Sequence, residues 1–237
     1  MRTWSNNDRI FLGRNAGEEL IRAIKDAKSS VKIVSPYLSS SYVKELVELS
    51  KKGKKVTLIT CDKLVDKGNR YSDLDASELV KETKTISPEK EKIRKTGMFF
   101  GLIALLISLA LFSVSLFVQT GVFISIPIFL ISSLVLGYYF LMSSSKIEYA
   151  PIFRIKVFDS TSGNRQGSAE LIHAKIYVID EKVAYLGSAN FSYSGFKKHY
   201  ESLIEIQDSK AVKEISNEVE ALYNSNFLKE KPIEDWI

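Results

Sequence analysis

Apolar positions recur with helical and strand periods in the first part of the chain. Residues 16–30 place apolar side chains at helical spacing, and residues 31–38 form a short apolar run with strand character. A second helix over 41–53 ends at a glycine and precedes a second buried strand over 54–60. Strands that alternate with helices of this length predict a parallel or mixed sheet with helices on its faces.

The same pattern resumes after residue 150. The sequence predicts strands over 151–159, 169–180, 183–189 and 202–208, and an amphipathic helix over 209–227. Neither fragment has enough strands for a stable sheet of its own. We therefore expect one α/β domain, with a mixed sheet flanked by helices, assembled from residues 1–61 and 143–237.

The segment between these two parts has a different composition. Residues 98–142 contain no charged residue, whereas 26% of the whole chain is charged. A bilayer core takes about 20 apolar residues of helix, so this run predicts a transmembrane hairpin with spans at 98–118 and 122–142. A buried helix pair in a soluble protein is the alternative, although such helices rarely stay uncharged over two such lengths. Residues 62–97 are expected to form a polar linker, with one helix around 73–82.

The cations beside this hairpin predict its orientation. Six precede the first span and three follow the second, whereas the turn at 119–121 has none: Lys81, Lys84, Lys90, Lys92, Arg94, Lys95, Lys146, Arg154 and Lys156. The excess of positive charge favours both termini and the folded domain on the cytoplasmic side of a cell membrane that the chain crosses twice. The single cysteine, Cys61, agrees with a compartment that needs no internal disulfide.

The overall charge indicates an anionic partner without identifying it. The net charge is +5 and the isoelectric point is about 9.0, which suits either nucleic acid or an anionic membrane surface. The basic run at 90–95 lies beside the hairpin, and such runs are more often topology and lipid-headgroup signals than nucleic-acid sites. No protein partner can be inferred.

The candidate chemistry lies in residues 171–192. Strand alternation places His173 and Lys175 on one face of the predicted strand over 169–180. An imidazole near neutral pH can attack phosphorus or donate a proton. Lys175, the hydroxyl of Ser188 and the amide of Asn190 would supply donors for the charge on phosphoryl oxygens. This combination indicates a phosphate site, although a lone histidine in a strand is usually a hydrogen-bonded core residue.

The spacing of these residues resembles the signature of the phospholipase D superfamily, H-x-K-x4-D-x6-G-S-x-N. The matching positions, read in order, are His173, Lys175, Asp180, Gly187, Ser188 and Asn190. Eleven residues after Asn190 stands Glu201, where many members carry a glutamate that orients the histidine. One departure is His199, where many single-motif relatives have asparagine.

This resemblance implies a metal-independent phosphodiesterase that works in two steps and needs no cofactor. His173 would form a phosphohistidine, and a second histidine would protonate the leaving oxygen and later activate water. Lys175, Ser188, Asn190 and Glu201 would complete the site, and Asp180 would brace the fold. Two motifs are required and this chain has one, so we expect a homodimer with a two-fold axis through the active site.

The motif indicates phosphodiester chemistry and leaves the alcohol open. The first hypothesis is a membrane-anchored nuclease that acts on DNA or RNA, because the segment 187–201 looks more like small dimeric endonucleases than like two-motif lipid enzymes. The second is a phospholipid phosphodiesterase, of the cardiolipin type, that the hairpin holds near headgroups. The third is an inactive phosphate-binding membrane scaffold. Two histidines and one cysteine cannot form a zinc set, and no phosphate loop or calcium loop is present.

Overall fold

The chain divides into two compact units, each described here by itself. The computed structural model describes residues 8–62, 75–118, 122–159, 172–226 and 228–236. The first unit combines Met1–Lys81 with Tyr149–Ile237, and the second is Glu82–Glu148. Two segments far apart in the sequence therefore build one domain, and the intervening segment forms the second unit.

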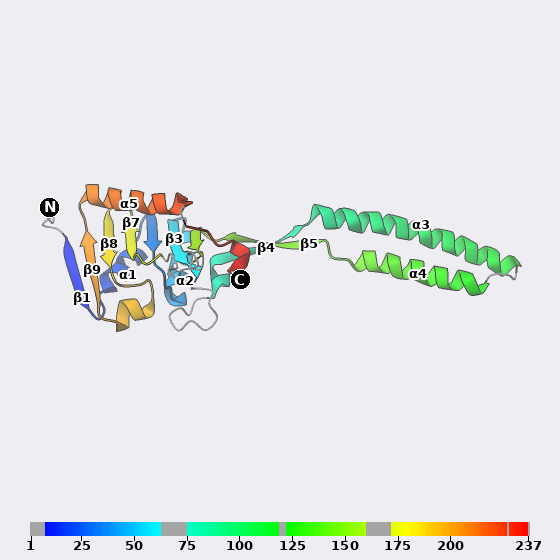
Figure 1. The fold of residues 1–237 in the computed structure, drawn as a ribbon, viewed down its shortest axis with the longest axis horizontal. Helices are drawn as coiled ribbons and strands as arrows, with labels where there is room; N and C mark the ends of the chain where they lie inside the picture. Colours follow the sequence, from blue (N-terminus) through cyan, green and yellow to red (C-terminus); the bar gives the residue numbers. More distant parts are fainter. Residues whose placement is uncertain (1–7, 63–74, 119–121, 160–171, 227, 237) are drawn as a thin grey trace, which may run out of the picture. The chain divides into compact units, whose positions relative to one another are not determined.

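The first unit is built on a seven-stranded mixed sheet (Figure 1). Its strands are β1 (Arg9–Gly13), β2 (Ser30–Val34), β3 (Lys55–Cys61), β6 (Arg154–Phe158), β7 (Ile176–Ile179), β8 (Val183–Gly187) and β9 (Glu201–Ile206). Their order across the sheet is β1-β9-β8-β7-β2-β3-β6. Strands β2, β3 and β6 are parallel, and the remaining pairs are antiparallel. The predicted mixed sheet with flanking helices is confirmed.

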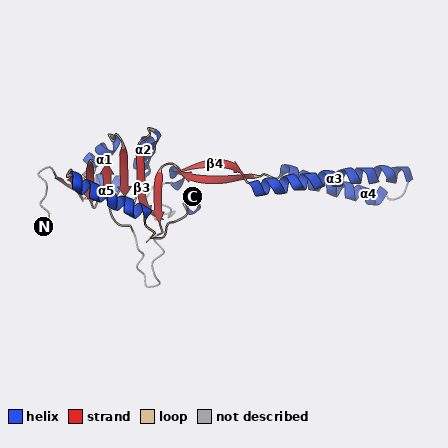
Figure 2. Ribbon diagram, turned by 90° about the horizontal axis from the view of Figure 1, so that it is seen from above, coloured by secondary structure: helices blue, strands red, loops and turns tan. Residues whose placement is uncertain are grey.

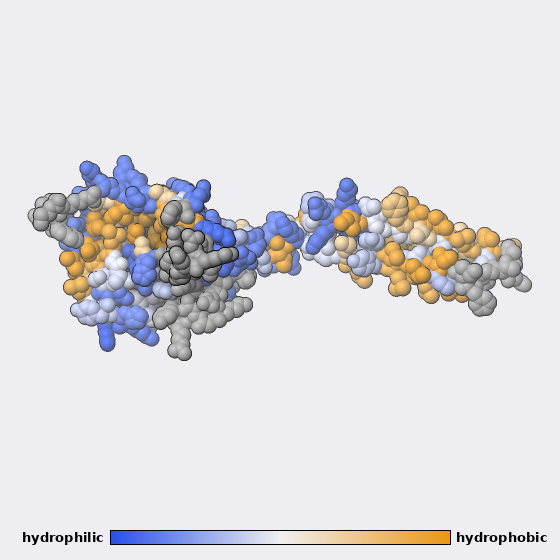
Figure 3. Space-filling model, in the orientation of Figure 1, coloured by the Kyte–Doolittle hydropathy of each residue, from blue (hydrophilic) through white to orange (hydrophobic). Residues whose placement is uncertain are grey.

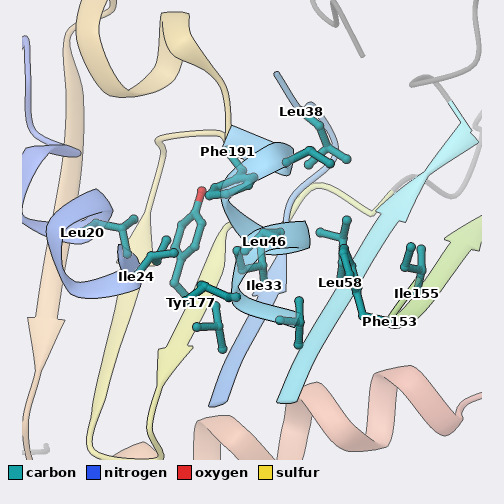
Figure 4. Close-up of a cluster of buried hydrophobic side chains, with 14 of the residues drawn as sticks. Leu20, Ile24, Ile33, Leu38, Leu46, Leu58, Phe153, Ile155, Tyr177 and Phe191 are labelled. Atoms are coloured by element: carbon teal, nitrogen blue, oxygen red, sulfur yellow. The ribbon is translucent and has the colours of Figure 1, made fainter. Parts of the chain in front are cut away.

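Helices cover both faces of this sheet (Figure 2). Helices α1 (Glu18–Lys25) and α2 (Ser40–Lys51) lie on one face, and α5 (Ser209–Asn224) lies on the other. The core beneath α1 and α2 contains fully buried side chains from both helices and from neighbouring strands, as Figure 4 shows for Leu20, Ile24, Ile33, Leu46 and Tyr177. Burial of each such side chain stabilises the fold by about 1.5–3 kcal/mol, which explains why the apolar periodicity predicted these elements.

Two details of the sheet differ from expectation. Strand β1 was not predicted, and it forms an edge through pairing with β9. The strand expected over 169–180 is observed only as Ile176–Ile179, while residues 169–171 lie outside the described part of the chain. Strand β2 ends at Val34, opposite Ile176, and Pro36 follows. Because proline has no N–H to donate, the pairing of β7 with β2 stops there and His173 precedes the strand.

The polar linker expected at 62–97 contains regular structure in its described part. A short 3-10 helix, η2 (Ala76–Leu79), leads into strand β4 (Val80–Ile86), which pairs with β5 (Ser145–Pro151) as a separate two-stranded sheet. Helix α3 already begins at Pro88. The two paired strands flank the hairpin about 60 residues apart in sequence, so their pairing leaves little local signal.

The second unit is a helical hairpin of α3 (Pro88–Val118) and α4 (Val122–Leu141). Gly97 lies against the ring of Tyr139, where an added Cβ would lie 2.4 Å from a ring carbon. Farther along, the hydroxyls of Ser108 and Ser132 are 3.0 Å apart. Close contact at small residues and hydrogen bonds between helices are the means by which helices associate in membranes.

The surface of the hairpin is largely hydrophobic (Figure 3). Within the described residues, one helix is long and apolar enough to cross a membrane, from Pro88 to Phe117, and the apolar stretch from Ile126 to Leu141 is shorter. The expected charge-free spans at 98–118 and 122–142 therefore correspond to the two helices of the hairpin. Among the described residues, only the first helix is long and apolar enough to cross a membrane.

Candidate active site

The predicted site residues converge on one edge of the seven-stranded sheet. Strand β8 is antiparallel to both β7 and β9, with Ile176 opposite Leu186 and Gly187 opposite Leu203. The start of β7, the end of β8 and the start of β9 therefore lie at the same edge. These three positions carry His173 and Lys175, then Ser188 and Asn190, then Glu201.

Lys175 and His173 are in direct contact at this edge. The ammonium Nζ of Lys175 lies 3.1 Å from Nδ1 and 3.4 Å from Nε2 of His173. It also donates to the main-chain oxygen of His173 at 2.7 Å. His173 is exposed, whereas Lys175 is only 7% exposed. Burial lowers the pKa of the Lys175 ammonium below its ordinary value, and the negative charge of Glu201 opposes this shift. The site thus pairs an accessible imidazole with a desolvated cation.

Ser188 and Glu201 form a second contact at the same edge. The Ser188 hydroxyl donates to the Glu201 carboxylate and accepts from the main-chain N–H of Ser202 at 3.0 Å. The main-chain N–H of Ser188 donates to the Ser202 oxygen at 2.9 Å. A Cβ at Gly187 would lie 2.0 Å from that same oxygen, so glycine is required where β8 and β9 approach each other.

Glu201 has different neighbours from those that the resemblance implies. Its expected role is to orient His173, yet none of the hydrogen bonds among the described residues joins the two side chains. Its carboxylate accepts from Ser188, and one of its oxygens lies 3.7 Å from Nδ1 of His199. In this arrangement, Glu201 contacts Ser188, and its negative charge raises the pKa of Lys175.

Asn190 presents a buried polar atom without a partner. Its side-chain oxygen is buried and has no hydrogen-bond partner within the described part of the chain. Unpaired buried acceptors are uncommon and call for an explanation, such as a group that arrives with a ligand. The main chain of Asn190 packs closely against Gly195. A Cβ at position 195 would lie 2.5 Å from the Asn190 main-chain oxygen, so a larger residue does not fit there.

Asp180 lies at the opposite end of β7, away from His173. Its carboxylate accepts from the main-chain N–H groups of Lys28, Ser29 and Ser30 at 2.6–3.0 Å, and from the Ser29 hydroxyl. Partial burial alone would raise its pKa, but these donors lower the pKa of Asp180 to about 2. Asp180 therefore joins the β7–β8 turn to the start of β2, which is a bracing position.

Other residues that shape the site could not be read from the motif. Ser35 is fully buried, and its hydroxyl accepts from the main-chain N–H of Phe191 at 2.9 Å and donates to the oxygen of Tyr37. Ser39 accepts in the same way from Tyr193. The hydrogen bond from Ser35 to Tyr37 agrees with the expected turn at residues 35–37. The bonds to Phe191 and Tyr193 join positions more than 150 residues apart, so they could not be read from the local sequence.

Comparisons with known proteins agree with this fold. Residues 142–223 match a family model described as cardiolipin synthase, PLD-like domain. No curated protein sequence matches the chain. Among solved structures, NucT from Helicobacter pylori is similar, with a TM-score of 0.52 and 16% identity over 95% of this chain and 99% of that chain.

Two further solved structures match at lower similarity. Nuc from Salmonella typhimurium, a phospholipase D family member, has a TM-score of 0.45 and 13% identity over 95% of this chain and 99% of that chain. Phosphatidylserine synthase from Haemophilus influenzae has a TM-score of 0.46 and 13% identity over 97% of this chain and 41% of that chain.

The fold and the site define an α/β protein that presents His173, Lys175, Ser188, Asn190 and Glu201 at one edge of a mixed sheet. Residues 142–223 are thus similar to a PLD-like domain, and this matched range includes all five predicted site residues.

Proposed function

We propose that the chain is a metal-independent phosphodiesterase that cleaves nucleic acid through a phosphohistidine at His173. The observation that carries this proposal is the contact between the exposed imidazole of His173 and the buried ammonium of Lys175. A desolvated cation beside a nucleophile stabilises negative charge that develops on phosphoryl oxygens more strongly than a solvated cation does. A bound phosphate would contact the Lys175 ammonium in place of the His173 imidazole. Substrate binding would therefore leave the imidazole nitrogen available for attack on phosphorus.

The chemistry proceeds in two balanced steps. A ring nitrogen of His173 attacks phosphorus and forms a P–N bond, the ester P–O bond breaks, and the leaving oxygen receives a proton from a second histidine. Water then attacks the same phosphorus and gives a proton to that second histidine, and the P–N bond breaks. Lys175, Ser188 and Asn190 supply donors to the phosphoryl oxygens, and Glu201 positions Ser188.

The second histidine is proposed to be His173 of another copy of the chain. The sequence contains one H-x-K pair, since His199 is not followed by a lysine at the second position. His199 is itself exposed and lies beside Glu201, so it is the other imidazole near the site. A two-fold axis that passes between the sites of two copies would bring both His173 side chains to one phosphate.

Nucleic acid is favoured as the substrate by the charge around the site. Lys197 and Lys198 follow Asn190 closely in the sequence. A polyanion gains affinity from each such contact by counterion release, so binding should weaken steeply with salt.

A phospholipid substrate is the second candidate, favoured by the match to a cardiolipin synthase model. We propose that the hairpin anchors the chain in a membrane, with both termini and the PLD-like domain on the cytoplasmic side. Retention of the chain in membranes washed with alkaline carbonate would support the anchor, and release into the supernatant would contradict it. Proximity to a bilayer serves either substrate and does not distinguish them.

The test uses purified full-length protein in detergent with EDTA present. Labelled single-stranded DNA, double-stranded DNA, RNA and cardiolipin vesicles are each incubated with the wild type and with His173→Asn. Cleavage of a nucleic acid that is lost in the variant supports the proposal. Turnover of cardiolipin alone supports the second candidate, and an absence of turnover on every substrate, with no trapped phosphoenzyme, indicates a phosphate-binding scaffold.

A further inference from the structure

Large apolar side chains are rarely exposed in the first unit. Among its described residues, four are mostly exposed: Ile10 and Leu12 on β1, and Tyr193 and Tyr200. Both tyrosines belong to the segment between Asn190 and Glu201, so each lies within three residues of a predicted site residue. Tyr193 is 50% exposed and Tyr200 is 78% exposed. Exposed aromatic rings beside a site are candidates for contact with a ligand.

The segment that carries these rings is anchored in the core. Phe191 and Phe196 are fully buried, and their ring centroids are 5.7 Å apart in an edge-to-face contact. Phe196 also lies 5.0 Å from the ring of Tyr42, and Phe191 packs beside Tyr177, as Figure 4 shows. The single π-helical turn η3 (Ser194–Lys198) closes the segment. The backbone that carries the two tyrosines is therefore anchored to the core before any ligand binds, which lowers the entropic cost of binding.

Each tyrosine has a defined setting at the site edge. The Lys198 ammonium lies 5.3 Å from the centroid of the Tyr193 ring, and the main-chain N–H of Tyr193 is fixed by Ser39. Tyr200 lies over the end of β1, where a Cβ at Gly13 would be 3.7 Å from its ring. Between the two rings stand Lys197, Lys198 and His199. The segment that carries the two rings therefore also carries two cations and an imidazole.

We propose that Tyr193 and Tyr200 are stacking positions for unpaired bases on either side of the scissile phosphate, which makes single-stranded nucleic acid the substrate class. This inference rests on the proposed nuclease function. Aromatic rings combined with cations are the means by which proteins hold single strands, because every base offers a flat face to a ring. A duplex has its base faces stacked internally and offers none. Acyl chains need a continuous apolar surface, whereas here charged residues separate two hydroxyl-bearing rings.

The test measures binding apart from cleavage. Full-length His173→Asn protein in detergent with EDTA is titrated against a fluorescent single-stranded oligonucleotide, its duplex, and the same single strand with abasic sites. We expect the single strand to bind tightest and the abasic strand to lose that advantage. Tyr193→Ala and Tyr200→Ala should each weaken single-strand binding about tenfold or more, whereas Tyr193→Phe and Tyr200→Phe keep it. Tyr138→Ala, which removes an exposed tyrosine from α4, should change nothing.

Other outcomes overturn the inference in distinguishable ways. Equal binding of single strand and duplex, unchanged by the alanine variants, contradicts base stacking and leaves the nuclease proposal standing. Absence of binding to any nucleic acid contradicts both proposals. Loss of the dimer in Tyr193→Ala or Tyr200→Ala, measured by light scattering, would assign the rings to a subunit interface. Weaker binding of cardiolipin vesicles, with oligonucleotide binding unchanged, would assign them to lipid.

Discussion

The ammonium of Lys175 lies 3.1 Å from Nδ1 of His173 while its own side chain is almost fully buried. A lysine in this position is costly for the fold, because an ammonium loses hydration on burial. The buried lysine is therefore better explained by contact with a ligand than by a contribution to stability. Activity and stability measurements on the same variant distinguish these two roles.

Replacement of Lys175 by methionine should lower activity and leave stability intact. Methionine keeps the length of the side chain and removes the desolvation penalty, so the free energy of unfolding should stay equal or rise. The rate should fall by about 10²–10³, the usual effect of losing one preorganised donor. Initial rates and denaturant unfolding of the same preparation check both. A variant that unfolds easily but retains its rate would make Lys175 a structural residue.

The pH dependence of the reaction should report the lowered pKa of Lys175. Because burial lowers this pKa below 10.5, the ammonium is lost at a lower pH than in a free lysine, and activity should fall there as pH rises. The same shift makes the fold gain stability from this group as pH rises through that window. Glu201→Gln removes a charge that raises the pKa, so the alkaline limb should move to lower pH.

Glu201→Asp is the matched control for that experiment, because it keeps the charge while shortening the side chain. Its alkaline limb should stay near that of the wild type. An alkaline limb that is the same in Glu201→Gln as in the wild type would show that Lys175 does not control it.

Asp180→Asn should destabilise the fold without a direct effect on the chemistry. The variant weakens charge-assisted hydrogen bonds to the backbone at Lys28, Ser29 and Ser30, a loss of about 1–3 kcal/mol. A carboxyl with its pKa lowered to about 2 contributes stability above pH 4 that is lost as pH falls toward 2, so the difference between variant and wild type should shrink over this range.

Asp208→Asn provides a comparison for Asp180→Asn, because Asp208 accepts one backbone bond at the start of α5 and asparagine caps helices almost as well. Thermal unfolding of both variants between pH 2 and pH 6 is the measurement. An equal loss in the two variants, or a difference from the wild type that is independent of pH, would contradict the bracing role of Asp180.

Mixed oligomers test whether two copies share one site. If an equal mixture of wild type and His173→Asn is allowed to exchange subunits fully, about one quarter of the dimers contain two wild-type copies. Activity should then be about one quarter of that of the same total amount of wild type. An activity of about one half would mean that each copy works alone, and the mixture measured before exchange serves as the control.

The hairpin offers a matched pair of glycines. Gly97→Ala would place a Cβ 2.4 Å from the Tyr139 ring and should separate the two helices locally, whereas Gly137 has open space around it. In detergent, we expect Gly97→Ala to lower the temperature of helix loss measured by circular dichroism, and Gly137→Ala to leave it equal or higher. Equal effects of the two variants would mean that the contact between Gly97 and Tyr139 does not stabilise the hairpin.

The sequence by itself determined the elements and residues whose signals are local. Helices α1, α2 and α5 and the central strands follow from apolar periodicity, because each buries one face in a shared core. The charge-free run at 98–142 marked the hairpin, since an uncharged stretch of that length is visible without any partner. The spacing from His173 to Asn190 carried the resemblance to the phospholipase D superfamily, because residues at fixed offsets around one strand pair need no distant contact to be recognised.

The tertiary structure decided everything that depends on pairing between distant segments. Strand β1 lies about 190 residues before its partner β9, and β4 lies about 60 before β5, so neither pairing leaves a strong pattern in its own neighbourhood. The neighbours of Glu201 are set by the register of β8 with β9, which brings its carboxylate to Ser188 and not to His173. Strand register and the packing of the core determine which hydrogen bonds form. Neither can be read from the spacing of residues in the sequence.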